Sequence, residues 1–242
     1  MRKYNYGSII LILIVNAIIS GILQNIADGN LSILSGFVAF IFDYIICRGL
    51  LYNREGSFSD YFRGIKTMTG KVFLMNILVG AITVALLTLA ALASGAGFLL
   101  FSDYAIKDTK IVISLIVLFT LVMIFTSLIF AYLNFFMADE RYRDLPFFDS
   151  LKLILKAGIK LFSESFMAGV KAYKITLLTG VIALVTGILS MKAPAAAVFA
   201  IIFGVIAAIS LFLCTPPFRA SLSDIYMDRA EEIYNEVIGC ED

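Results

Sequence analysis

Six apolar stretches, each long enough to cross a bilayer as a helix, limit what this chain can fold into. Crossing the hydrocarbon core takes about 20 helical residues. The stretches cover about 8–26, 31–51, 72–100, 111–137, 175–191 and 195–215. Because 61% of the 242 residues are hydrophobic and only 15% are charged, the apolar excess has to face lipid. We expect an all-α, polytopic membrane helix bundle that forms a single membrane domain over 1–242.

The distribution of basic residues predicts the orientation of the spans. If the N-terminus is cytoplasmic, 16 of the 19 Lys and Arg residues lie in the two tails and in segments 48–71 and 138–174. The opposite loops hold Lys107, Lys110 and Lys192. Cytoplasmic loops carry the excess of Lys and Arg, so both termini are expected in the cytoplasm. The first span is interpreted as an uncleaved anchor rather than a signal peptide, since no cleavage site of small residues follows it.

Three cytoplasmic segments, about 57–71, 145–172 and 218–237, are predicted to form amphipathic helices in the inner interface. In the first segment, Ser57 and Asp60 have the spacing of a capping box. The second segment carries an apolar stripe on one face and a row of lysines on another.

Prolines and small residues predict two further details of the spans. Pro216 and Pro217 are expected to close the sixth span, because proline lacks the backbone N–H that continues a helix. Small residues recur every four positions on the last two spans, at Ala200, Gly204 and Ala208 and at Ala183 and Gly187. This spacing allows close packing between helices of the bundle, and the alternative is a contact with a second copy of the chain.

A weak internal repeat of two spans followed by an interfacial helix is also indicated. Aligning Phe58 with Phe147 matches Asp60 to Asp149. Phe58 and Asp60 follow the first two spans, and Phe147 and Asp149 follow the next two. The alternative is that amphipathic helices after spans look alike through shared physics.

Two cytoplasmic motifs carry a resemblance to known families. FSDYFRGIK follows the first two spans, and DERYRDLPFFDSLKLILK follows the next two. This order resembles bacterial YciC-like membrane proteins and the membrane domain attached to some glycerophosphodiester phosphodiesterases. The resemblance covers nearly the whole chain. It implies a six-helix bacterial membrane domain with no established reaction, and it carries over no catalytic residue.

Asp43 is the one acid within the six spans, and it is the main candidate for a polar site. A carboxylate at the bilayer centre costs about 2.5–3.5 kcal/mol on insertion scales. Asp43 is expected at the same depth as Asn16 on the neighbouring helix. It could form an ion, proton or substrate site. The structural alternative is a hydrogen bond to Asn16 or an electrostatic tether to Arg48 at the inner interface.

A row of lysines on the second amphipathic helix is the candidate contact for anionic lipid headgroups. Lys152, Lys156 and Lys160 form the row, with Lys171 and Lys174 beyond it. Each basic residue near an anionic surface contributes about 1 kcal/mol. The alternative is ordinary positive-inside topology with side chains that snorkel.

The inventory of reactive side chains does not favour an enzyme. The chain has no histidine, and no Walker A, HExxH or Ser-x-x-Lys motif occurs. We therefore expect no catalytic residue, no metal site and no cofactor, and the net charge of +1 gives no support for nucleic acid binding. The expected function is a non-catalytic scaffold, regulatory or accessory component of the cytoplasmic membrane. Its expected partners are membrane lipids, and a membrane protein or a second copy of the chain. The alternative is a small transporter or permease subunit that uses Asp43.

Overall fold

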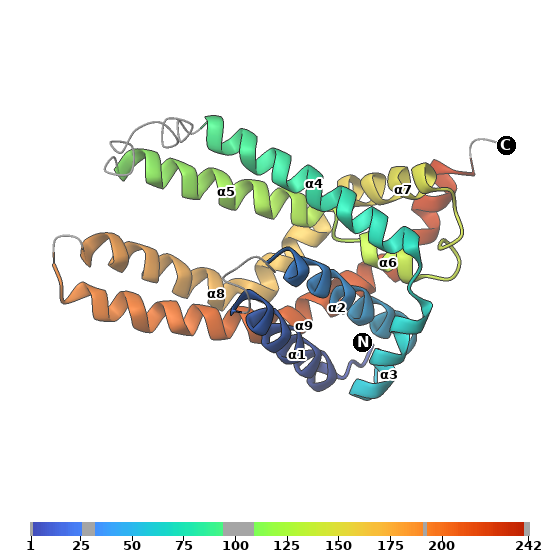
Figure 1. Cartoon of the computed structure of the whole chain (residues 1–242), viewed down its shortest axis with the longest axis horizontal. Helices are drawn as coiled ribbons and strands as arrows, with labels where there is room; N and C mark the ends of the chain where they lie inside the picture. The colour runs from blue at the N-terminus through green and yellow to red at the C-terminus, as the bar shows by residue number, and fades with distance from the viewer. Residues whose placement is uncertain (1, 26–31, 94–108, 191–192, 240–242) are drawn as a thin grey trace. The chain divides into compact units, whose positions relative to one another are not determined.

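The computed structural model describes residues 2–25, 32–93, 109–190 and 193–239, and within these ranges it contains helices and no strand (Figure 1). Six of the described helices are long and apolar enough to cross a membrane, which confirms the predicted all-α fold. The helices are α1 (Tyr6–Asn25), α2 (Ser32–Tyr52), α3 (Phe58–Phe62), the 3-10 helix η2 (Arg63–Thr67), α4 (Gly70–Ala93), α5 (Thr109–Ile129), α6 (Leu133–Ala138), α7 (Phe147–Lys160), α8 (Phe162–Ser190) and α9 (Ala196–Val237).

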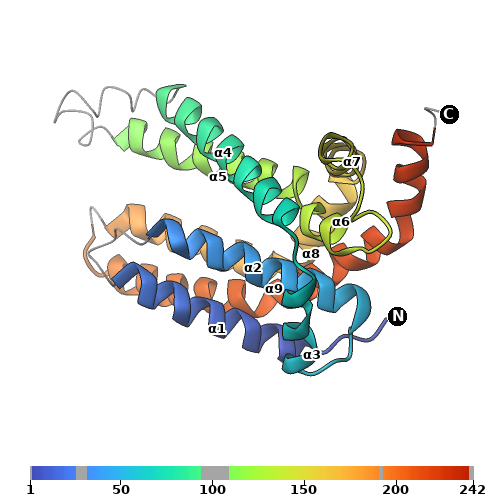
Figure 2. The same cartoon turned by 45° about the vertical axis from the view of Figure 1, so that its right-hand side comes forward.

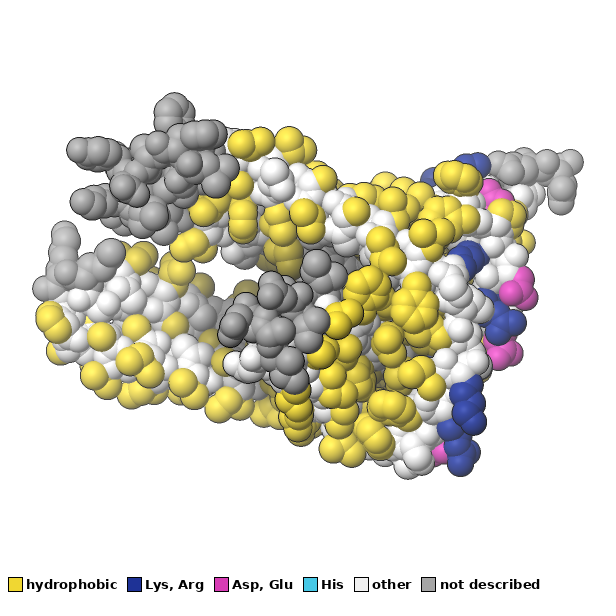
Figure 3. Space-filling model, viewed as in Figure 1, with side chains coloured by type: hydrophobic (Ala, Val, Ile, Leu, Met, Phe, Trp, Pro, Cys, Tyr) yellow, Lys and Arg dark blue, Asp and Glu magenta, His cyan; other side chains and the backbone are white. Residues whose placement is uncertain are grey.

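The long helices keep large apolar side chains on their surface (Figure 3). Leu89 on α4, Leu178 on α8 and Ile201 on α9 are 60–66% exposed. A water-soluble fold rarely exposes continuous apolar surface of this kind, so these sides need lipid.

Some predicted positions lie outside the described residues: positions 26, 31 and 191, the segment 94–100, and Lys107 and Lys192 of the opposite loops.

The first of two compact units comprises Met1–Met68 and Ser163–Glu231, and so holds α1, α2, α3, η2, α8 and most of α9. The pairs α1–α2 and α8–α9 each form an antiparallel hairpin (Figures 1 and 2). Helix α3 packs on the end of α2, where a Cβ added at Gly49 would overlap the ring of Tyr61. The Tyr61 side chain is fully buried, and this burial raises its pKa to about 12.

The segment between α2 and α4 begins as the sequence predicts. The carboxylate of Asp60 accepts hydrogen bonds from the hydroxyl of Ser57 (2.7 Å) and from its N–H (2.9 Å), and these two bonds lower the pKa of Asp60. The structure then has α3 and η2 where the sequence predicts one helix over 57–71. The hydroxyl of Thr67 donates to the carbonyl of Gly64 (2.7 Å), and Met68 is extended, so the helix ends before α4 begins.

The second unit comprises Thr69–Phe162 and Glu232–Asp242. Its spans α4 and α5 form a hairpin, and the chain turns at 130–132 before α6. At that turn the N–H of Leu133 donates to the carbonyl of Phe130, three residues back (3.1 Å). Helix α7 packs there so closely that a Cβ added at Gly158 would overlap the backbone carbonyl of Ile129. A helix-to-backbone approach of this kind requires glycine.

The predicted amphipathic helix over 145–172 is two elements in the structure. Helix α7 ends at Lys160, the buried Leu161 makes the turn, and α8 begins at Phe162. The end of the predicted helix, from Phe162 on, therefore continues into the fifth span. The two parts of α8 meet at Tyr173, whose backbone is not helical (φ −95°, ψ 15°).

The prediction that Pro216 and Pro217 close the sixth span is wrong, because α9 continues through both. Each proline removes one backbone hydrogen bond, but contacts on either side hold the helix in place. The hydroxyl of Tyr173 donates a hydrogen bond to the hydroxyl of Thr215 (3.3 Å). The centre of the Tyr173 ring lies 5.2 Å from the centre of the Phe218 ring. The predicted helix over 218–237 is therefore the continuation of the sixth span.

The close packing expected within the bundle at Gly187 and Gly204 does not occur in the described part of the chain, whereas a contact there with a second copy stays a prediction. A Cβ added at either position meets no described atom within 4 Å. The close approaches occur instead at Gly49 and Gly158, at the ends of the spans, where short helices fold back.

Replacing Gly158 by Ala should lower the free energy of unfolding by about 1–3 kcal/mol, because α7 has to move away from the Ile129 carbonyl. Unfolding by SDS in mixed micelles measures this change. The matched control is Gly180→Ala on α8, where an added Cβ meets nothing and helix propensity predicts a gain of about 1 kcal/mol. Equal effects of the two substitutions would contradict the close contact.

Candidate functional site

Asp43 on α2 forms an ion pair with Arg219 on α9, both within the first unit. The two side chains are 24% and 26% exposed. Arg219 is not among the partners that the sequence predicts for Asp43. The available signal was that Arg219 follows the apolar part of the last span by four residues, so a long guanidinium side chain could reach back into the membrane region.

The pairing indicates the depth of Asp43. Four residues of helix correspond to about 6 Å, so Arg219 lies close to the end of the apolar part of α9. Asp43 therefore lies near that end of the spans rather than at the bilayer centre. An acid at this depth, with a cation beside it, is far less costly than an isolated carboxylate in hydrocarbon.

The same end of the unit carries further polar contacts between α9 and the N-terminal tail. The guanidinium of Arg2 binds the carboxylates of Asp224 (3.0 Å) and Asp228 (2.7 Å). The hydroxyl of Tyr4 donates to Asp224 (2.6 Å), and burial together with this bond raises the pKa of Tyr4. These contacts bring the N-terminal tail to the polar part of α9.

The end of α2 is joined to the same region. Arg54, just beyond α2, contacts the sulfur of Met227 on α9. The carbonyl of Arg54 accepts a hydrogen bond from the N–H of Asn5 (2.8 Å). Within this unit the N-terminal tail, the end of α2 and the polar part of α9 therefore share one end.

The two residues that the sequence places beside Asp43 have other contacts as well. The side-chain carbonyl of Asn16 accepts a hydrogen bond from Ser20 on its own helix (3.4 Å). The guanidinium carbon of Arg48 lies 4.9 Å from the centre of the Tyr52 ring, a cation–π distance. The sequence predicts Asn16 or Arg48 as the structural partner of Asp43, and the structure adds a third residue, Arg219, which forms an ion pair with it.

In the second unit, the lysine row of α7 meets the end of α9. Lys156 lies 2.8 Å from Glu236, and Lys160 lies 3.0 Å from Glu232 and 2.6 Å from Glu236. The hydrogen bonds that the ammonium of Lys160 donates to Glu236 and Glu232 raise the pKa of Lys160. Lys152 lies 3.9 Å from Asp149, one turn earlier on α7. The row therefore has carboxylate partners, and its contact with lipid headgroups stays a prediction.

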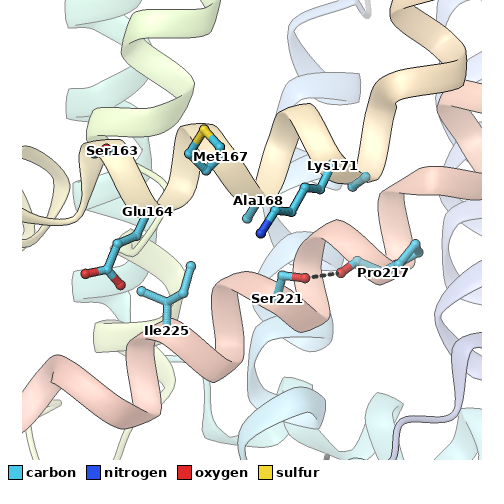
Figure 4. A pocket seen from close by; sticks show the side chains of 9 residues that line it. Ser163, Glu164, Met167, Ala168, Lys171, Pro217, Ser221 and Ile225 are labelled. Carbon is cyan, nitrogen blue, oxygen red and sulfur yellow. Dashed lines mark hydrogen bonds between the residues drawn. The ribbon is translucent and has the colours of Figure 1, made fainter.

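A groove of about 650 Å³ lies between the part of α8 before Tyr173 and the part of α9 after Pro216 (Figure 4). Its lining includes Glu164, Met167 and Lys171 from α8, and Pro217, Ser221 and Ile225 from α9. A second, open groove is lined by Arg2 to Tyr6 and by Glu55. Asp43 lines neither of these two grooves.

Comparison with protein families, curated proteins and solved structures finds no match to this chain, so the resemblance noted above stays a prediction. Over residues 2–25, 32–93, 109–190 and 193–239, no three His, Cys, Asp or Glu side chains gather as a group that could hold a metal ion.

Replacing Asp43 by Asn should lower the free energy of unfolding by about 3 kcal/mol, because Arg219 loses its counter-charge in a largely buried position. The control is Asp228→Asn, which breaks an ion pair whose carboxylate is 62% exposed and should cost at most about 1 kcal/mol. Unfolding of both variants by SDS in mixed micelles measures the difference. Equal losses would mean that the Asp43–Arg219 pair behaves as a surface pair.

Proposed function

We propose that the chain is a non-catalytic scaffold or accessory component of the cytoplasmic membrane. The observation that carries this proposal is the ion pair between Asp43 and Arg219. The acid that the sequence marks as the main candidate for transport chemistry has a fixed counter-charge from another helix.

The ion pair favours a structural role for physical reasons. A carboxylate that binds and releases a proton or a metal ion has to exchange partners during each cycle. A guanidinium stays protonated at all accessible pH values, so it is a permanent competitor for the cation. Neutralising an acid in this way stabilises helix association and works against ion binding.

The surface of α7 supports a role in contact with lipid or with another protein. Its buried face consists of Ser150, Leu153, Ile154, Ala157 and Gly158. On the opposite face, Phe148 is 73% exposed and Ile159 is 64% exposed. The two side chains lie eleven residues apart, which places them on one side of the helix. An amphipathic helix with large apolar side chains on its outer face is suited to binding at a membrane interface.

The proposal places both termini in the cytoplasm. The excess of Lys and Arg in the tails and in segments 48–71 and 138–174 supports this orientation. The contacts of Arg2 with Asp224 and Asp228 are compatible with it, since they require the N-terminal tail and the polar part of α9 to be on one side.

A small transporter that uses Asp43 is the second candidate. It is favoured by the partial exposure of the pair, 24% for Asp43 and 26% for Arg219. In this function the pair would open during transport, and Asp43 would bind the transported cation.

Proton and sodium flux into liposomes separates the two functions. Wild-type protein is reconstituted beside the Asp43→Asn and Asp228→Asn variants, and uptake is followed with a pH-sensitive dye and with ²²Na⁺. The scaffold function predicts that all three proteins match empty liposomes, while Asp43→Asn loses more stability than Asp228→Asn does. Wild-type flux that disappears in Asp43→Asn and persists in Asp228→Asn would establish the transporter instead.

A further inference from the structure

We propose that the groove between α8 and α9 binds the headgroup of an anionic glycerophospholipid, with its phosphate on Lys171. The groove lies within the first unit, and its lining combines one cation with an apolar wall. This site is distinct from the lysine row of α7, which belongs to the second unit.

The level of the groove along the helices favours a lipid headgroup. Lys171 precedes the apolar part of α8, which begins at Ile175, by four residues, or about 6 Å of helix. Pro217 lies two residues, or about 3 Å, beyond Thr215, where the apolar part of α9 ends. The headgroup layer on each side of a bilayer is roughly 5–7 Å thick. The end of the groove nearest the spans, where Lys171 and Pro217 lie, is therefore at the level of the lipid phosphates.

The charges in the groove suit an anion. The exposed Lys171 makes no ion pair or hydrogen bond with any other side chain in the described ranges. Figure 4 shows its ammonium group directed from α8 into the groove, toward Ser221 of α9. The one carboxylate in the lining, Glu164, lies 3.3 Å from the guanidinium of Arg229, which offsets its charge. The cation of Lys171 is thus left to attract a phosphate.

The remaining lining suits the glycerol backbone and the first methylenes of a lipid. Met167 is 50% exposed, and Ala168, Ala172, Pro217 and Ile225 complete an apolar wall beside the lysine. A free inorganic phosphate would leave this apolar surface in water, whereas a lipid would cover it. The combination favours a phospholipid over a soluble phosphate.

Titration of the purified full chain in neutral detergent micelles tests the site. Dioleoylphosphatidylglycerol is added at increasing mole fraction, with dioleoylphosphatidylcholine and inorganic phosphate as separate arms, and the thermal unfolding midpoint is followed. Wild-type protein should show a saturable rise with phosphatidylglycerol. The half-saturating mole fraction should increase about fivefold in Lys171→Gln, the factor that corresponds to ~1 kcal/mol for one basic residue.

Two further variants make the result specific. Lys174→Gln removes an exposed cation three residues away on α8 that does not line the groove, so it should titrate as the wild type does. Ala168→Phe keeps every charge but fills the groove, so it should lose the saturable rise. Equal effects of Lys171→Gln and Lys174→Gln, a normal titration of Ala168→Phe, or an equal rise with inorganic phosphate would each overturn the proposal.

Discussion

A charged group on a membrane helix has to find a counter-charge or water, and in the first unit this requirement is met where Asp43 on α2 contacts Arg219 on α9. The two residues come from the second span and from the continuation of the last one. Their contact therefore joins the beginning and the end of the chain. It also requires α9 to continue past Pro216 and Pro217, since a helix that ended there would not carry Arg219 to Asp43.

The polar part of α9 organises both units, each through its own contacts. In the first unit it binds Arg2 of the N-terminal tail through Asp224 and Asp228. In the second unit its last turns bind Lys156 and Lys160 of α7 through Glu232 and Glu236. Most of these pairs are exposed and contribute little individually. Their number along one helix suggests a role in fixing which segments pair with α9.

The sequence predicts the spans well because hydropathy over about 20 residues depends on composition and not on tertiary contacts. The capping box at Ser57 and Asp60 was predictable for a similar reason, since it is local. The partner of Asp43 was not predictable, because nothing in the sequence specifies which helices are neighbours. The course of α9 was also missed, because the contacts of Tyr173 with Thr215 and Phe218 override the usual effect of proline. Likewise, the close approach at Gly158 depends on a turn at 130–132 that hydropathy does not reveal.

The central claim is that Asp43 acts through its pairing with Arg219, and a double-mutant cycle tests it directly. Unfolding in mixed micelles is compared for Asp43→Asn, for Arg219→Gln and for the variant that carries both substitutions. Removing both charges leaves no unpaired ion, so the double variant should be more stable than either single variant. If instead the two losses simply add, the residues act independently, and the structural account of Asp43 is contradicted.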